Sequence, residues 1–171
     1  MFCYQCEETA RGTGCTVKGV CGKEDHTAGF QDVLIYLCKG ISARNIPAIV
    51  KGEGNKDAGS FITEALFATL TNTNFDDQRI KELINQAVFI RDAIPKSGDN
   101  EPDACTWTPK SDADIQAKAK EIADLAHVDD DVHSLQAMLI FGLKGLAAYY
   151  HHAEILGYMD EEITNFMQKG L

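Results

Sequence analysis

The sequence has no uninterrupted apolar run of about 18 residues, which is the length that a helix needs to cross a bilayer. Its first residues, MFCYQC, also lack the basic segment and apolar run of a signal peptide. Positive charge is scarce, because 16 Lys and Arg residues stand against 26 Asp and Glu residues and the formal net charge is −10. Partners rich in phosphate need Lys and Arg, so the composition argues against nucleic acid and against an anionic membrane surface as partners. We therefore expect a soluble, cytoplasmic protein.

What remains is the composition of an ordinary globular protein. Hydrophobic residues make up 44% of the 171 residues and charged residues 25%, close to the averages for soluble domains. A chain of this length can form one domain or two small helical units packed together. Disorder of the whole chain is therefore not expected.

Cysteine is unevenly distributed, because four of the six cysteines lie within the first 21 residues. Cys3, Cys6, Cys15 and Cys21 form the pattern C-x2-C-x8-C-x5-C. In a reducing cytoplasm such clustering favours metal binding over disulfides. Residues 1–28 are also rich in glycine and show no helical or strand period, so something other than their own side chains must hold them.

Four thiolates can bind either tetrahedral zinc or an iron–sulfur cluster. Structural zinc sites with four cysteines usually pair two short C-x2–4-C knuckles, whereas this segment has only one. A compact iron–sulfur cubane tolerates unequal spacings better, so the spacing favours iron–sulfur over zinc and leaves disulfides or free thiols as a third alternative. Arg11, Lys18 and Lys23 add positive charge nearby, which lowers the pKa of thiols.

Helical periodicity follows the cysteines, and it predicts an all-α fold. Residues 29–95 contain three amphipathic helices, which we expect to form a first three-helix bundle. Gly40 and Pro47 mark the later part or the end of the first helix. Ser60 is placed to cap the second helix, and Asp76 suits the start of the third.

The rest of the chain continues this pattern. Residues 96–131 are a polar connector followed by a helix that we expect over residues 111–126. Residues 132–171 begin with a long apolar helix that extends to about residue 156, and a last helix follows from residue 161.

The two parts of the chain resemble each other. Residues 30–41 read FQDVLIYLCKGI and residues 135–146 read LQAMLIFGLKGL, with five identities at a constant offset of 105. At the same offset Phe61 corresponds to Phe166. We interpret this as an internal repeat of a helical unit, with chance similarity between two amphipathic helices as the alternative.

The second copy stops early. Leu171 corresponds to Leu66, so the second copy lacks the end of one helix and the whole of another. We expect residues 132–171 to be an incomplete bundle, packed against the first, in a chain that is the N-terminal piece of a longer protein. Missing partner helices would leave apolar surface exposed, and we expect self-association to cover it.

The segment MFCYQCEETARGTGCTVKGVCGK, followed by QDVLIYLCKGIS, resembles the start of the hybrid cluster proteins, a family also called prismane proteins or hydroxylamine reductases. The segments FITEALFATLTNTNFDD and SLQAMLIFGLKGLAAYYHHAEILGY are also similar to that family's N-terminal domain, so the resemblance covers essentially the whole chain. It implies that Cys3, Cys6, Cys15 and Cys21 bind a [4Fe–4S] cluster, as in the class of the family found in anaerobes.

The resemblance also implies a function. Members of the family reduce hydroxylamine to ammonia, and nitric oxide reduction has been proposed for them. Their hybrid iron–sulfur–oxygen cluster lies in two further α/β domains, and none of its ligand positions exists in this chain. We therefore expect the chain to relay electrons from a redox donor protein towards those domains and to be inactive alone. A zinc-stabilised helical interaction module without redox function is the alternative.

The remaining cysteines and several histidines have ordinary expected roles. Cys38 lies on the apolar face of its helix and is expected to be a small buried hydrophobe. Cys105 is expected to be a free, partly packed thiol in the connector. His26 is close to the cysteines in sequence, but a fifth ligand is not needed with four thiols. His151 and His152 point about 100° apart on a helix, so we expect them to pack rather than to share a metal.

Overall fold

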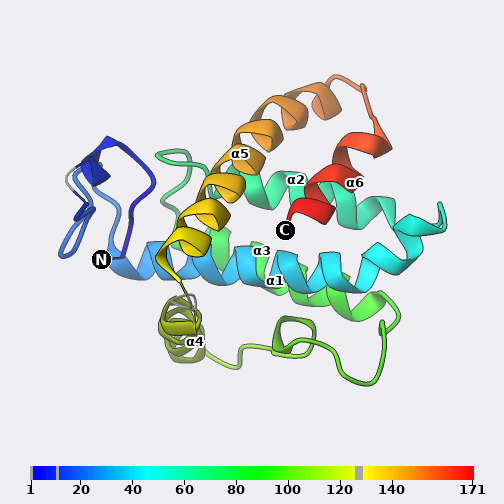
Figure 1. The fold of residues 1–171 in the computed structure, drawn as a ribbon, viewed down its shortest axis with the longest axis horizontal. Coiled ribbons are helices and arrows are strands. Elements are labelled where there is room, and N and C mark those ends of the chain that lie inside the picture. The colour runs from blue at the N-terminus through cyan, green and yellow to red at the C-terminus, as the bar shows by residue number, and fades with distance from the viewer. Residues whose placement is uncertain (1, 11, 126–128) are drawn as a thin grey trace.

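The computed structural model describes residues 2–10, 12–125 and 129–171, and the regular structure in these ranges is helical apart from one isolated bridge (Figure 1). The α-helices are α1 (Asp25–Val50), α2 (Lys56–Ala68), α3 (Asp77–Ala93), α4 (Asp112–Leu125), α5 (Asp130–Ile155) and α6 (Glu161–Gly170), and the short 3-10 helices are η1 (Glu7–Thr9) and η2 (Asp103–Cys105). The predicted all-α fold is confirmed. Met1, Arg11 and residues 126–128 lie outside the described residues, and with them the predicted charge of Arg11 and the predicted helix end at Ala126.

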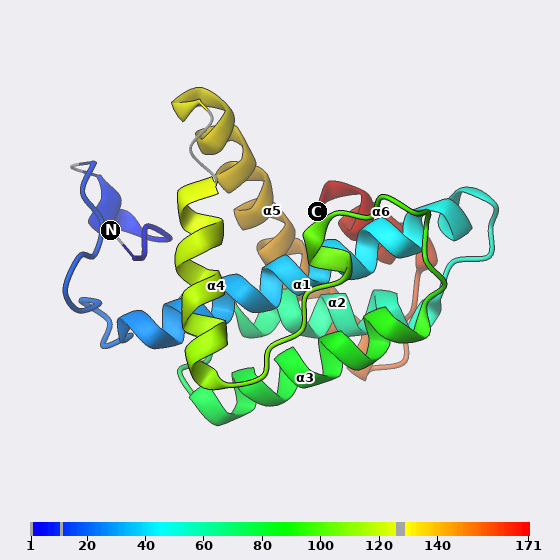
Figure 2. The ribbon, with the colours of Figure 1, turned by 90° about the horizontal axis from the view of Figure 1, so that it is seen from below.

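α1 is the central helix of the fold. α3 lies alongside it, α4 crosses it, and α5 and α6 pack mainly against α2 (Figure 1, Figure 2). The residues that precede α1, which we call the cysteine segment (residues 2–10 and 12–24), lie beyond its N-terminal end (Figure 1). Side chains of all six α-helices share one hydrophobic cluster, among them Leu34, Ile62, Ile84, Ile115, Leu143 and Met167. The helices of the two expected bundles are therefore joined by a common core.

Short-range capping decides where the helices start. Asp76 caps α3 by accepting hydrogen bonds from two backbone amides at 2.9 and 3.2 Å, and Asp160 caps α6 by accepting one from the Glu162 amide at 2.8 Å. The prediction that Ser60 caps the second helix is wrong. The side chain of Asn55 accepts a hydrogen bond from the Ala58 amide (3.0 Å), so α2 begins earlier and Ser60 lies inside it.

α1 continues past the proline that was expected near its end. Pro47 lies inside the helix, which ends one turn later at Val50. By length and composition α1 could cross a membrane, because its average hydropathy is high although charged residues interrupt its apolar runs. However, 56% of its most apolar window is buried inside the fold. The other helices therefore cover much of α1, and its high hydropathy is that of a helix in the core of the fold.

The helix boundaries recur at the same offset as the repeat that the sequence suggested. Both bounds of α5 lie 105 positions after those of α1, and α6 begins 105 positions after α2. This offset equals the one that aligns the two sequence segments. A chance likeness between two apolar segments would not also match three helix boundaries, so we favour the internal repeat.

The repeat copies differ in how well they are covered. α1 is enclosed by α2, α3, α4 and η2, whereas α5 contacts α2 and α6. Exposed large apolar side chains accordingly gather in the second copy and include Leu135, Met138, Leu139, Tyr149, Leu156 and Phe166. The expectation that this part of the chain exposes apolar surface is confirmed.

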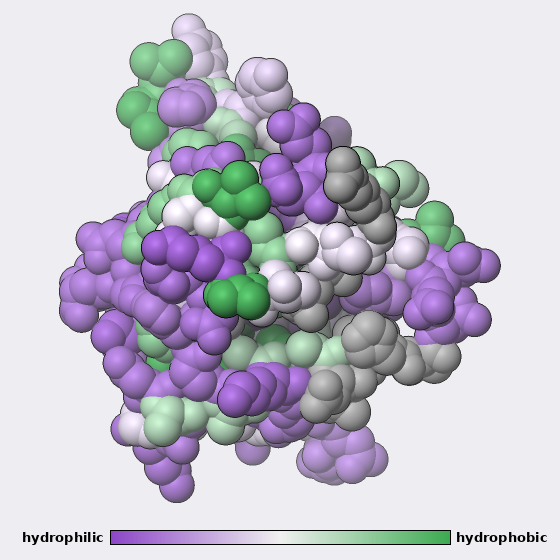
Figure 3. Space-filling model, turned by 90° about the vertical axis from the view of Figure 1, so that its left-hand side faces the viewer, coloured by the Kyte–Doolittle hydropathy of each residue, from purple (hydrophilic) through white to green (hydrophobic). Residues whose placement is uncertain are grey.

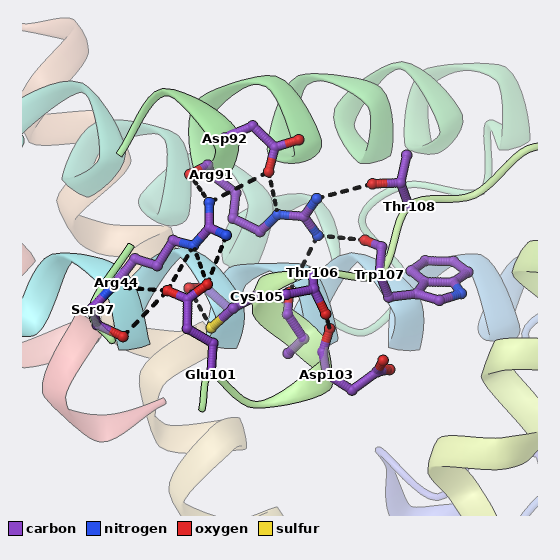
Figure 4. A network of polar contacts seen from close by, with 12 residues as sticks. Arg44, Arg91, Asp92, Ser97, Glu101, Asp103, Cys105, Thr106, Trp107 and Thr108 are labelled. Atoms are coloured by element: carbon purple, nitrogen blue, oxygen red, sulfur yellow. Dashed lines mark hydrogen bonds and ion pairs between the residues drawn. The ribbon is translucent and has the colours of Figure 1, made fainter. Parts of the chain in front are cut away.

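The connector between α3 and α4 is fastened by two buried arginines (Figure 4). Arg44 donates to both carboxylate oxygens of Glu101, at 2.8 to 3.2 Å, and to the Arg91 carbonyl at 2.9 Å. These contacts hold the pKa of Glu101 below its ordinary value, so the ion pair is formed at neutral pH. Cys105 is a free thiol, as expected, but it is fully buried. Its thiol donates a hydrogen bond to the Gly40 carbonyl (3.5 Å).

Close approach of the connector to α1 requires a glycine. A Cβ atom added to Gly40 would overlap the backbone carbonyl of Ala104, which cannot move without shifting η2. We expect Gly40→Ala to lower the free energy of unfolding by about 3 kcal/mol, the upper range for overpacking. Chemical denaturation followed by circular dichroism measures this change.

The repeat supplies a matched control for that substitution. Gly145 is the counterpart of Gly40, and a Cβ atom there would meet nothing within 4 Å. Gly145→Ala should therefore be neutral or stabilise by up to about 1 kcal/mol, because alanine favours helix. Equal destabilisation by both variants would contradict the assigned role of Gly40.

Candidate functional site

The four cysteines singled out by their spacing line one cavity. Its volume is about 380 Å³, and its wall includes Cys3, Cys6, Cys15 and Cys21 together with Tyr4, Glu7, Glu8, Thr9, Gly19, Val20, Lys23, Thr71 and Asn72. All but two of these residues belong to the cysteine segment, and the two others belong to the turn after α2. The segment therefore folds into a cup against the helical core.

Backbone pairing brings the first and third cysteines together. Cys3 and Cys15 form an antiparallel bridge, in which the Cys15 amide donates to the Cys3 carbonyl at 2.9 Å. Between them, Gly12 and Gly14 have φ angles of 76° and 52°, a left-handed conformation that glycine adopts without strain. The glycines that separate the thiols in the sequence thus turn the chain back so that distant cysteines face one cavity.

The four thiols differ in exposure. Cys15 is buried, Cys3 is intermediate, and Cys6 and Cys21 are exposed. Within residues 2–10, 12–125 and 129–171, no three Cys, His, Asp or Glu side chains are gathered closely enough to form a metal centre. The cavity therefore brings the four cysteines to one place without drawing their sulfur atoms into a compact ligand set.

Helix α5 supports the turn between the first two cysteines. The Tyr4 ring packs against Phe141 and His133, with ring centroids 6.0 and 5.7 Å apart. The side-chain carbonyl of Gln5 accepts a hydrogen bond from Lys144 Nζ at 3.1 Å. Both residues of the Cys-x-x-Cys turn that are not cysteines are thereby fixed to one helix.

Buried positive charge surrounds the inner side of this site. Lys23 lines the cavity, is 1% exposed and donates to Gln31 Oε1 at 2.7 Å. Lys144 is 2% exposed, and burial lowers its pKa to about 8. Asp32 interacts electrostatically with both lysines, and burial raises its pKa to about 6 against their opposing effect. Two buried ammonium groups therefore face one acid whose own charge is disfavoured.

The outer side of the site is mixed in character. Figure 3 views the end of the molecule that carries the cysteine segment, where hydrophilic residues cover much of the surface and apolar patches lie between them. Val17 and Val20 are exposed apolar residues of this segment. Lys18 forms a surface ion pair with Glu24 at 3.1 Å, so its charge is partly neutralised.

The other sequence candidates lie away from the cavity. His26 Nε2 pairs with Asp77 Oδ2 at 2.8 Å, and its ring is not part of the cavity wall. Cys38 is buried in the core, where burial raises the pKa of its thiol to about 12, as expected for a small hydrophobe. His151 and His152 both pack against the Phe67 ring, which confirms their expected packing role.

Comparison with known proteins identifies the family. The Prismane/CO dehydrogenase family model matches residues 1–171. The chain belongs to this family. It is 46% identical over 179 residues to a hydroxylamine reductase of Desulfitobacterium hafniense (strain DSM 10664 / DCB-2) and 45% identical over 184 residues to one of Halothermothrix orenii. It is 44% identical over 180 residues to a hydroxylamine reductase of Methanococcus vannielii.

These relatives are longer than the chain. Each alignment covers 100% of the chain and 33% of the relative, so the chain spans about a third of the length of the curated relatives it matches. The resemblance noted in the sequence is therefore confirmed at the level of the family. Functions that depend on the remaining two thirds of the prismane-family relatives lie outside the residues compared.

Sequence reasoning missed the residues that support the cysteine cavity from the side of the helical core. Lys144 is one of the five identities of the repeat, where it corresponds to Lys39, but the repeat assigns no role to it, and the sequence does not single out Asp32, Tyr4 or Gln5. The available signal was a lysine in the middle of an otherwise apolar helix, where burial would demand a partner. Such a signal does not say which distant residue the partner is.

Proposed function

We propose that the chain is the electron-transfer part of a hydroxylamine reductase of the hybrid cluster type. In this proposal Cys3, Cys6, Cys15 and Cys21 bind a [4Fe–4S] cluster, and electrons pass from it to a hybrid cluster held by α/β domains of the same polypeptide. The overall reaction is the reduction of hydroxylamine to ammonia or the reduction of nitric oxide. The chain alone would then be inactive, because it contains no ligand of the hybrid cluster.

The observation that carries the proposal is the meeting of four free thiols at one cavity. Thiolates are the usual ligands of iron–sulfur clusters, and a cluster held by four of them is an anion. The buried ammonium groups of Lys23 and Lys144 match that charge in a protein whose net charge is −10. The donor set and the charge of its surroundings therefore both fit a thiolate-bound cluster.

When bound, such a cluster supplies a one-electron relay. The residues of this chain determine where the cluster would lie. Cys15 and Lys23 hold the buried side of the cavity, and the exposed Cys6 and Cys21 lie on the side that a partner can approach. A redox donor protein would dock there in the cytoplasm, next to Val17 and Val20.

The exposed apolar residues of α5 and α6 would form a second contact, separate from the one with the donor protein. They are proposed to pack against the α/β domains, and in the isolated chain we expect them to drive self-association. Light scattering at several protein concentrations measures this directly, and a monomer at all of them would contradict it.

Anaerobic metal and sulfide analysis tests the proposed function. We expect about four irons and four acid-labile sulfides per chain, with brown colour and visible absorption that bleaches on reduction. One zinc per chain without sulfide would instead support a structural metal site and would contradict electron relay. A chain reconstituted with iron and sulfide that binds neither would contradict the cluster assignment itself.

A further inference from the structure

We infer that Lys144 is a positioning residue of the cysteine site, which fixes the Cys-x-x-Cys turn to α5 and supplies buried positive charge that favours the reduced cluster. This inference rests on the proposed function, since it assumes that the four cysteines hold an anionic cluster. It assigns a role to a side chain on the second copy of the repeat, 123 positions after the last of those cysteines.

The geometry shows Lys144 joining three parts of the chain. Its Nζ atom donates to Gln5 Oε1 in the cysteine segment at 3.1 Å and to the Thr69 carbonyl at the end of α2 at 3.0 Å. Thr71, just after α2, donates to the Gln5 carbonyl at 3.2 Å. Gln5 is therefore held from two sides, and with it the turn that connects Cys3 to Cys6.

Hydrogen bonding alone does not explain why a lysine occupies this position. Two carbonyl oxygens could be satisfied by a neutral amide, whereas an ammonium group that is 2% exposed carries a large desolvation cost. Asp32 offsets only part of that cost, because burial also disfavours its charge and Lys23 and Lys39 act on the same carboxylate. On its other side, Lys144 donates to Gln5, which lies in the sequence between Cys3 and Cys6 of the cavity wall, so its ammonium group lies next to the turn that carries two of the four thiols.

An anion in the cavity would complete this arrangement. Each electron that enters a thiolate-bound cluster adds one negative charge, and a nearby buried cation stabilises the reduced form more than the oxidised form. Removing the charge should therefore make reduction harder. Removing only the hydrogen-bond geometry should instead change how well the segment retains iron.

The test compares three variants of the iron–sulfur-loaded chain. Lys144→Gln keeps a hydrogen-bond donor and removes the charge, and Lys144→Arg keeps the charge. Lys51→Gln makes the same charge change on an exposed residue that follows the C-terminal end of α1, at the far end of that helix from the cysteine segment. The readouts are iron per chain and the reduction potential from an anaerobic titration followed by visible absorption.

We expect the equilibrium constant for reduction to fall about tenfold in Lys144→Gln, which is about 59 mV for a one-electron couple. Lys144→Arg and Lys51→Gln should stay within about threefold of the unmodified chain. Loss of iron in Lys144→Gln that Lys144→Arg restores would also support the inference. It is overturned if Lys144→Gln binds full iron at an unchanged potential, or if both Lys144 variants lose iron equally. The absence of iron from the unmodified chain would instead reject the proposed function.

Discussion

Replacing Cys15 with serine is expected to remove the iron–sulfur cluster. Cys15 is the most buried of the four cysteines that line the cavity, and its backbone is paired with that of Cys3. Serine preserves that pairing and the side-chain volume but replaces a thiolate ligand with a hydroxyl. Iron should fall from about four atoms per chain to fewer than about one, with parallel loss of sulfide and of visible absorption.

A second cysteine provides the control for that experiment. Cys38 is also buried, in α1, but it does not line the cavity. Cys38→Ser should lower stability by about 1–3 kcal/mol, because it buries a hydroxyl among apolar side chains, and should leave the iron content unchanged. If both variants lost iron to the same extent, the loss would reflect weakened folding and the ligand assignment of Cys15 would fail.

Features that depend on neighbouring residues could be predicted from the sequence. Asp76 was expected at the start of the third helix and caps it, because the capping hydrogen bonds reach amides only two or three residues away. The repeat offset of 105 was also visible, and the helix boundaries agree with it. The same reasoning failed at α2, where both Asn55 and Ser60 could cap a helix and only the fold decides between them.

Features that depend on distant residues could not be predicted. The sequence grouped the four cysteines by their spacing, but the support that Gln5 receives from Lys144 joins positions 139 residues apart. Gly40 was expected to mark the later part or the end of its helix, and it lies in the later part of α1, but nothing in the sequence indicated that it allows the Ala104 carbonyl to approach. In each case the role comes from an element that packs against the residue, and periodicity along one helix contains no information about that element.

The connector between α3 and α4 provides the largest expected effect on stability. Arg91 is 1% exposed and donates hydrogen bonds to the Trp107 carbonyl, to the Ala104 carbonyl at 3.3 Å and to Thr108 Oγ1 at 3.0 Å (Figure 4). Arg91 on α3 thereby ties the backbone of the connector to the helix that precedes it. Arg91→Met would fill similar volume and leave the buried Ala104 carbonyl and the partly buried Trp107 carbonyl without this donor.

We expect Arg91→Met to lower the free energy of unfolding by about 3–5 kcal/mol, because it removes three hydrogen bonds from a charged donor, each worth about 1.5–3 kcal/mol, and water compensates part of that loss. Arg79→Met is the matched control, because Arg79 is also on α3 but pairs with Glu64 and Glu82 at the surface. It should cost less than about 1 kcal/mol. Urea denaturation of both variants measures the difference, and equal costs would mean that the connector is held by its other contacts. In that case Arg91 would be replaceable, and the connector would remain on α1 through the buried Ala104 and Cys105 and through the Arg44–Glu101 ion pair.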